Sequence, residues 1–378
     1  MDRLSLRQFV LLTFMLAMAM KMFNLPVLML RMCGRDAFVS LIVELVIDLA
    51  LLALVLAVVL TSGGKSFYDL IAAAFGRVTA RVTAAVAGLY YLCKLYFMLV
   101  DVRLFFSNTV FPTSVGALHL LPLVIVLVYF ATRPLSSAGR LGEIFTPFAA
   151  AGIVLLGVLT LPHVDFGGLR PLLADGWGRA AEGVASLPVW FGDFTLLLVA
   201  VGRVDGGKKL LLSLVSALVG FACLAVFSAV LFASYGDMPD LLTYGHSISS
   251  VAQYAAGSFR FGRFDLVIFS LWLSAVFLSA GMITAFFSRS MAYALGGKAG
   301  AVAAVAGGVA LTVAMIFTVN LNLAVEWATG YFALPSFVVQ YGLPVLGAAA
   351  AAVCRITEHI KKKRRENDEK TAARENGE

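Results

Sequence analysis

Ionisable side chains within apolar stretches are the residues of this sequence with the greatest capacity for chemistry. Lys21, Glu44, Asp48, Lys94 and Asp193 each lie in a run of mostly apolar residues. At membrane depth such a group costs at least about 2.5–3.5 kcal/mol to insert, so each needs a partner or a function. We therefore treat all five as candidates for proton or ion coupling.

Lys21 lies beside a predicted helix break. Pro26 lacks an amide hydrogen and clashes with the carbonyl of residue 22, so the helix should kink or unwind over 22–25. The carbonyl groups freed there suit an ammonium ion. The alternative is that Lys21 extends to a membrane interface, which is difficult because it lies about fourteen residues past Arg7, near mid-bilayer.

The next charged residues follow helical spacing. Glu44 and Asp48 are four residues apart and share a helix face, where their charges repel and one of them can hold a proton. A proton relay, pairing with Lys94 and a structural ion pair are all open. Lys94 and Asp101 share a face two turns apart, and we expect structural roles for Asp101 and Arg103.

A second break with an ionisable residue is predicted near Asp193. Pro188 and Gly192 flank two aromatic residues immediately before this carboxylate. A regular helix tolerates such a sequence poorly. We expect Asp193 to face a cavity, and the alternative is a structural, hydrogen-bonded carboxylate.

Other kinds of site find little support in the sequence. The four cysteines and four histidines are scattered and form no ligand motif, and no nucleophile and base occur at a suitable spacing. Gly64-Lys65-Ser66 resembles the end of a phosphate-binding loop, but Val59 occupies the position of the required glycine. We predict no catalytic residue, no metal and no cofactor.

The composition predicts a membrane protein. The 378 residues are 61% hydrophobic and 13% charged, with a mean hydropathy of +0.92, whereas soluble domains have about 45–50% apolar and about 25% charged residues. This number of charges is too small to cover a water-exposed surface. We therefore expect most of the outer surface to face lipid. The net charge of +7 is too small and dispersed for a nucleic-acid-binding protein.

Apolar stretches long enough to cross a ~30 Å hydrocarbon core define the domain. There are ten, at about 8–30, 37–60, 83–107, 117–132, 141–161, 184–202, 209–234, 264–289, 299–319 and 329–354. We predict one transmembrane domain over 1–354, with half-repeats of about 8–161 and 184–354. Residues 66–75 are expected to lie along the interface, and 355–378 to form a charged, partly disordered cytoplasmic tail.

Basic residues predict the topology of these ten spans. Outside the tail, the side that carries both termini holds 12 lysines and arginines, and the opposite side holds 6. Because cytoplasmic loops carry an excess of basic residues, both termini should be cytoplasmic.

The two predicted breaks occupy matching positions, since each lies in the first span of its half. Inverted-repeat transporters place discontinuous helices at the bilayer midplane in this way. Their half-helix N-termini face an anionic group and their free carbonyls face a cation. The sequence therefore predicts an all-α polytopic protein with ten transmembrane helices, a 5+5 inverted repeat and broken helices 1 and 6.

Short motifs occur in order along nearly the whole chain, up to about Arg355. They are 6–9 (LRQF), 24–26 (NLP), 34–38 (GRDAF), 139–144 (GRLGEI), 165–166 (DF), 169–172 (LRPL), 192–193 (GD), 262–265 (GRFD) and Trp272. In these the chain resembles the spore germination receptor B-subunit permeases of the amino acid–polyamine–organocation superfamily, which implies a leucine-transporter-like fold. Two positions depart from the pattern: Lys21 stands in a segment where the superfamily has small glycines, and Asp193 stands where glutamate is expected.

The resemblance also implies a function. It implies a germinant-sensing subunit of the inner membrane of a bacterial spore, which binds a small amino-acid-like ligand between helices 1 and 6 and works with a large receptor subunit and a lipoprotein. An autonomous proton-coupled amino acid transporter is the alternative. The candidate ligand-binding residues are Met20, Lys21, Phe23, Asn24, Tyr96, Trp190, Phe191, Gly192, Asp193 and Trp272.

Overall fold

The computed structural model describes residues 3–21, 25–107, 120–160, 167, 172–205, 211–235 and 265–375. These residues form a bundle of helices with one two-stranded parallel pair, β1 (Leu4–Ser5) with β2 (Val204–Asp205). The helices of the first half are α1 (Leu6–Met18), α2 (Leu25–Cys33), η1 (Gly34–Asp36), α3 (Ala37–Thr61), α4 (Phe67–Phe75), α5 (Arg77–Phe105), α6 (Leu121–Ala131) and α7 (Leu135–Thr160). Those of the second half are α8 (Trp177–Ser186), η6 (Pro188–Trp190), η7 (Asp193–Ala200), α9 (Leu211–Tyr235), α11 (Asp265–Leu295), α12 (Ala299–Phe317), α13 (Leu321–Thr329) and α14 (Ala333–Glu375).

The apolar helices agree in position with the predicted spans. Six helical segments of the described residues are long and apolar enough to cross a membrane, and α8 with η6 and η7 forms a further, bent pair. Three shorter apolar helices are Leu6–Met18, Leu121–Ala131 and Leu211–Val226. Each predicted span overlaps one or more of these segments, while the count of ten crossings stays a prediction.

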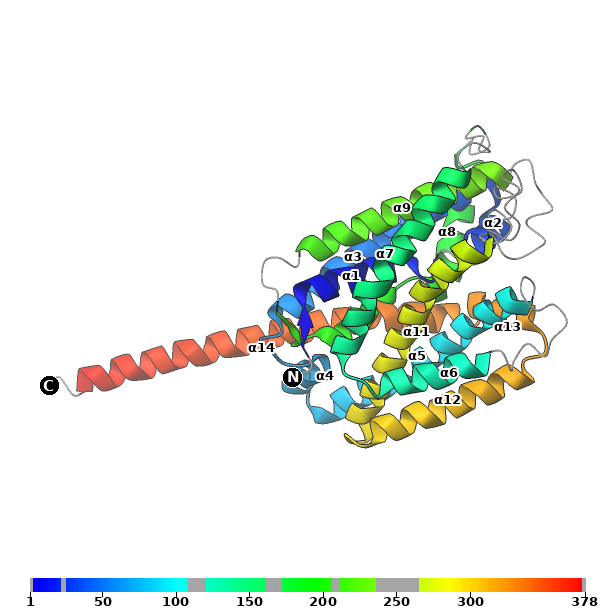
Figure 1. The fold of residues 1–378 in the computed structure, drawn as a ribbon. Helices are drawn as coiled ribbons and strands as arrows, with labels where there is room; N and C mark the ends of the chain where they lie inside the picture. The colour runs from blue at the N-terminus through cyan, green and yellow to red at the C-terminus, as the bar shows by residue number, and fades with distance from the viewer. Residues whose placement is uncertain are drawn as a thin grey trace.

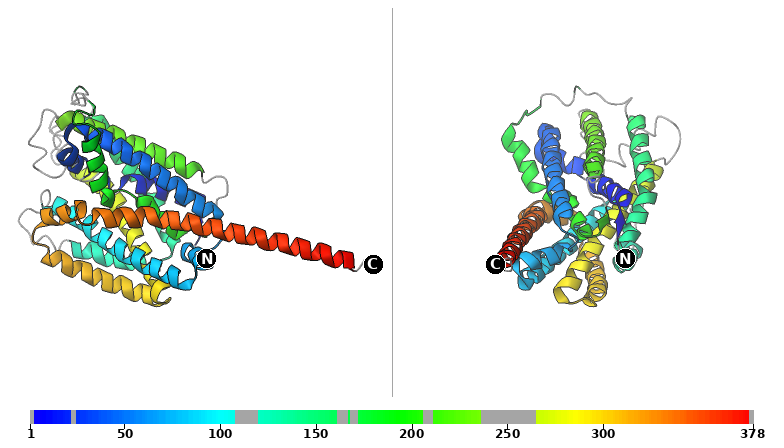
Figure 2. Two further views of the ribbon diagram at one scale, coloured as in Figure 1. Left: turned by 180° about the vertical axis from the view of Figure 1, so that it is seen from behind. Right: turned by 90° about the vertical axis from the view of Figure 1, so that its left-hand side faces the viewer.

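The bundle surrounds a centre where the interrupted segments meet. The helix α11 packs against α5 and α7, α1 packs against α9 and α7, and α14 packs against α3 and α4 (Figure 1). The short segments η6 and η7 contact α3, α14 and α1. The left view of Figure 2 shows the N-terminus at the end of the bundle from which α14 projects, so both chain ends lie on one side.

The first helical stretch is interrupted earlier than the sequence predicts. The helix α1 begins with a capping box of Ser5 and Gln8, but it ends at Met18 and is followed by a turn that reaches Lys21. The chain is helical again from Leu25. Pro26 therefore lies in the first turn of α2, where its missing amide hydrogen costs nothing because first-turn amides have no partner within the helix. Residues 22–24 of the predicted break lie outside the described residues.

The second predicted break is confirmed. The helix α8 ends at Ser186, and the chain continues through η6 and η7 at an angle of 58° to it. Gly192 separates these two 3-10 helices with a left-handed φ of 72°, a conformation that side chains with a Cβ rarely adopt. Gly192 therefore sets the path of the chain between η6 and η7, while the bend of 58° itself lies between Ser186 and Pro188.

The charged tail differs from its prediction. The helix α14 continues through it to Glu375, so the expectation of partial disorder is wrong for 355–375. Lysine, arginine, glutamate and alanine are strong helix formers, and Glu358 precedes Lys362 by the four residues that favour an ion pair along a helix. The predicted interfacial segment forms α4, capped by Ser66, and its place at a membrane surface stays a prediction.

Candidate functional site

Four of the five predicted charged residues meet in the centre of the bundle. Lys21 follows α1, Asp48 lies on α3, Lys94 on α5 and Asp193 at the start of η7, and at most 1% of each residue is exposed. Two positive and two negative groups therefore come together away from water. We call these four residues the charged cluster.

Asp193 joins the two lysines of the cluster. Its Oδ1 lies 2.7 Å from Lys94 Nζ and its Oδ2 lies 3.5 Å from Lys21 Nζ. Asp48 Oδ2 lies 3.1 Å from Lys21 Nζ, and Asp48 Oδ1 accepts a hydrogen bond from the amide of Gly192 at 2.9 Å. Buried ion pairs are tolerated when hydrogen bonds satisfy the remaining lone pairs, as the break does here for Asp48.

Lys94 makes two further contacts. Its ammonium donates to the carbonyl of Phe191 at 2.9 Å and to Oε1 of Gln340 at 2.6 Å. With Asp193, three oxygens thus surround a group that has three N–H donors. The sequence predicts freed carbonyls for an ammonium at the first break, beside Lys21; the carbonyl that accepts from a buried lysine here is that of Phe191 at the second break, and the lysine is Lys94.

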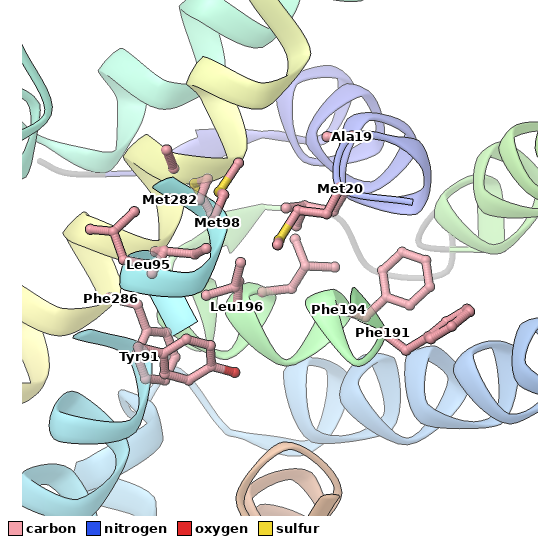
Figure 3. Close-up of a cluster of buried hydrophobic side chains, with 14 of the residues drawn as sticks. Ala19, Met20, Tyr91, Leu95, Met98, Phe191, Phe194, Leu196, Met282 and Phe286 are labelled. Atoms are coloured by element: carbon pink, nitrogen blue, oxygen red, sulfur yellow. The ribbon is translucent and has the colours of Figure 1, made fainter. Parts of the chain in front are cut away.

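Aromatic rings enclose Lys21. Its Nζ lies 5.4 Å from the ring centroid of Phe191, 5.8 Å from that of Phe194 and 5.8 Å from that of Phe221. These distances are within the range of cation–π attraction. Figure 3 shows Phe191 and Phe194 on the η6–η7 segment, Met20 after α1, and an apolar group from α5 and α11 beside them.

Gln340 is a site residue that the sequence analysis missed. Its Nε2 donates to the carbonyl of Pro188 at 2.7 Å, and its own backbone carbonyl accepts from the Thr195 hydroxyl at 2.7 Å. That carbonyl is free because Pro344, four residues later in α14, has no amide hydrogen. A polar glutamine within the last apolar span, four residues before Pro344, is the sequence signal that could have identified it.

The sequence left open an ion pair between an α3 carboxylate and Lys94, and the structure shows a different pairing. Asp48 pairs with Lys21, because Lys94 on α5 faces η7 and α14 instead. Glu44 is buried with 2% exposure. Within the described part of the chain it forms no ion pair, and its Oε2 has no hydrogen-bond partner. Glu44 therefore lies outside the charged cluster.

The remaining residues predicted to bind the ligand do not all lie at the charged cluster. Met20 is buried at the end of α1, and Trp190 is buried and donates from Nε1 to Asp101 at 2.8 Å. Tyr96 instead bonds to the Thr318 hydroxyl at 2.7 Å, so the structure does not bring it to the cluster. Phe23 and Asn24 lie outside the described residues, as does the side chain of Trp272.

Arg103 has the structural role predicted for it. It donates to the carbonyls of Met315 and Thr318, at 2.5 and 2.9 Å, and so binds α5 to the end of α12.

Near the second break, a cavity of about 630 Å³ lies between α3, α8, α13 and α14. Apolar residues such as Val43 and Phe337 line it, and it reaches Ser186 at the end of α8.

These features define a class of protein. An α-helical bundle with two interrupted segments crossing at a buried charged centre has the leucine-transporter-like fold, and solved transporters confirm it. MhsT in complex with L-phenylalanine matches with a TM-score of 0.62 at 14% identity, over 92% of this chain and 88% of that one. A Na⁺-coupled sialic acid symporter matches with a TM-score of 0.56 at 12% identity, over the same shares.

The family follows from the sequence itself. The model of the spore germination protein family, the spore permeases, matches residues 3–322, and the chain belongs to this family. No curated protein matches it significantly. The chain is therefore a multi-pass membrane permease of the spore germination family with the leucine-transporter-like fold, and the predicted resemblance is confirmed.

Proposed function

We propose that this permease is a germinant-sensing receptor subunit that binds a small amino-acid-like ligand between the α1–α2 break and the α8–η6–η7 break. The observation that carries the proposal is the charged cluster, which lies at both breaks and contains equal numbers of positive and negative groups. Membership of the spore germination family supports the biological role.

The balance of charge suits a zwitterion. The contact between Lys21 and Asp193, at 3.5 Å, is the longest ion pair of the cluster. A ligand inserted there pairs its carboxylate with Lys21 and its ammonium with Asp193, and the net charge of the site does not change. A ligand with one charge leaves a buried charge unpaired, which costs several kcal/mol.

Ligand binding would act on the bundle through differential contacts with two conformations. A ligand that binds one arrangement of the broken helices better shifts the population toward it. In the proposed receptor, a large subunit and a lipoprotein in the inner spore membrane receive this change. Both chain ends emerge on one side (Figure 2), which supports the proposed topology with both termini in the cytoplasm.

The proposal is tested by ligand-induced thermal stabilisation of the purified protein across the amino acids, together with the germinant response of spores. Lys21→Met and Asp193→Asn should weaken binding of the stabilising amino acid at least about tenfold, since each removes one partner of the zwitterion. Lys65→Met is the matched control, because this lysine is exposed and pairs with Glu358 at 3.4 Å. Unchanged responses in both site variants would refute the assignment.

Autonomous proton-coupled transport is the second candidate. The observation in its favour is Glu44, a buried carboxylate without an ion pair among the described residues, one helical turn from Asp48. Amino acid uptake by the protein in vesicles should then stop when the pH gradient is collapsed, and Glu44→Gln should abolish it. Binding without uptake would favour the sensing role.

A further inference from the structure

Lys94 is held in the way a free ammonium ion would be held. Its side chain is fully buried, and its Nζ lies 2.6, 2.7 and 2.9 Å from Gln340 Oε1, Asp193 Oδ1 and the Phe191 carbonyl. These are distances of charge-assisted N–H···O hydrogen bonds. The ammonium is thus fully coordinated by oxygens from two segments, the η6–η7 break and α14, that are distant from α5 in the sequence.

The three oxygens are positioned by contacts other than Lys94. Gln340 is fixed by its bond to the Pro188 carbonyl at 2.7 Å. Asp193 is also held by Lys21 at 3.5 Å, and the left-handed Gly192 sets the path of the chain between Phe191 and Asp193. The oxygens therefore form a receptor that keeps its partners when the lysine is removed.

We propose that Lys94 fills, with its own side chain, a binding site for a primary ammonium group. The Phe191 carbonyl and Asp193 are also the acceptors that the amine of a zwitterionic ligand needs, so the ligand competes with Lys94 for them. This competition rests on the proposed function, whereas the ammonium site itself does not. The cation at this site is the ammonium of Lys94 itself.

The site is tested by replacing the tethered ammonium with a free one. Lys94→Ala leaves room for a small amine, while Lys94→Met removes the charge but fills the space, and Lys65→Ala controls for the loss of an exposed lysine. The full-length proteins are melted in detergent in choline, sodium or methylammonium chloride at equal ionic strength. The choline series measures stability without a small cation.

In choline, Lys94→Ala should melt about 4–6 °C below the wild type, because it leaves buried acceptors without their cation. Methylammonium at about 100 mM should restore at least half of this loss, and sodium should not. The wild type, Lys94→Met and Lys65→Ala should respond equally to the three salts. Equal restoration by sodium, restoration of Lys94→Met, or no restoration of Lys94→Ala would overturn the proposal.

If Lys94→Ala yields no folded protein in any salt, a double-variant cycle decides. Lys94→Met and Gln340→Met should lower the melting temperature together by clearly less than the sum of their separate effects, because they remove the same contact. Additive losses would overturn the site. A failure of the proposed function looks different, since amino acids would then not stabilise the wild type while methylammonium still restored Lys94→Ala.

Discussion

Gly192→Ala tests the construction of the second break. Gly192 has a φ of 72°, and a Cβ added there would lie 2.6 Å from Oε1 of Gln340. Alanine must therefore adopt a left-handed conformation and also displace the amide that accepts from Lys94 at 2.6 Å. The substitution changes no charge and no hydrogen-bonding group directly.

The expected cost has two parts. The left-handed conformation costs alanine about 1–2 kcal/mol relative to glycine. Loss of a hydrogen bond to a charged group costs about 1.5–3 kcal/mol more. The free energy of unfolding should thus fall by about 2.5–5 kcal/mol, and the melting temperature of this chain of 378 residues by about 3–6 °C.

Gly63→Ala is the matched control. Gly63 has a φ of 60°, but no atom lies within 4 Å of the position of its Cβ, so alanine there carries only the conformational cost of about 1–2 kcal/mol. Both variants are melted in detergent at one heating rate, because irreversible unfolding makes the midpoint depend on that rate. Equal destabilisation of the two variants would refute the close contact between Gly192 and Gln340.

Further predictions concern the charged cluster, the indole of Trp190 and the tail. Lys21→Met and Asp48→Leu should each lower the free energy of unfolding by about 3–5 kcal/mol, and the double variant should recover much of the loss because no buried charge stays unpaired. If the stability losses of the two single variants simply add in the double variant, the ion pair between Lys21 and Asp48 is contradicted. Trp190→Phe should cost about 1.5–3 kcal/mol by removing the donor to Asp101, and an unchanged melting curve would exclude that bond. Ending the chain after Glu358 should leave the melting temperature of the bundle unchanged, since 359–364 are exposed, and a clear decrease would show that the tail packs on the bundle.

The second break was predictable because proline and glycine act locally, whereas the first interruption begins after Met18, before the position that Pro26 indicated, and Pro26 itself lies in the first turn of α2. Pro188 and Gly192 disturb helical geometry whatever surrounds them, and the structure interrupts the chain there. The five ionisable residues were also predictable, since a charge in an apolar run needs a partner. Four of them meet in one cluster.

The pairing of these charges could not be predicted from the sequence. Which lysine faces which carboxylate depends on the rotation of α3 and α5 about their axes, and helical spacing within one segment does not determine that rotation. The role of Gln340 depends on a contact across 152 residues of sequence. Helix formation in the tail was missed because its charge indicated disorder, while its residues favour a helix.

The helix α14 connects the charged cluster to a point far outside the bundle. Gln340 touches the break, and the same helix ends at Glu375, about 50 Å further along at 1.5 Å per residue (Figure 1). A tilt of about 5° around Pro344, where the helix lacks a backbone hydrogen bond, would move the far end by about 4 Å. A small rearrangement around one ammonium group would thus become a displacement that a neighbouring protein can sense.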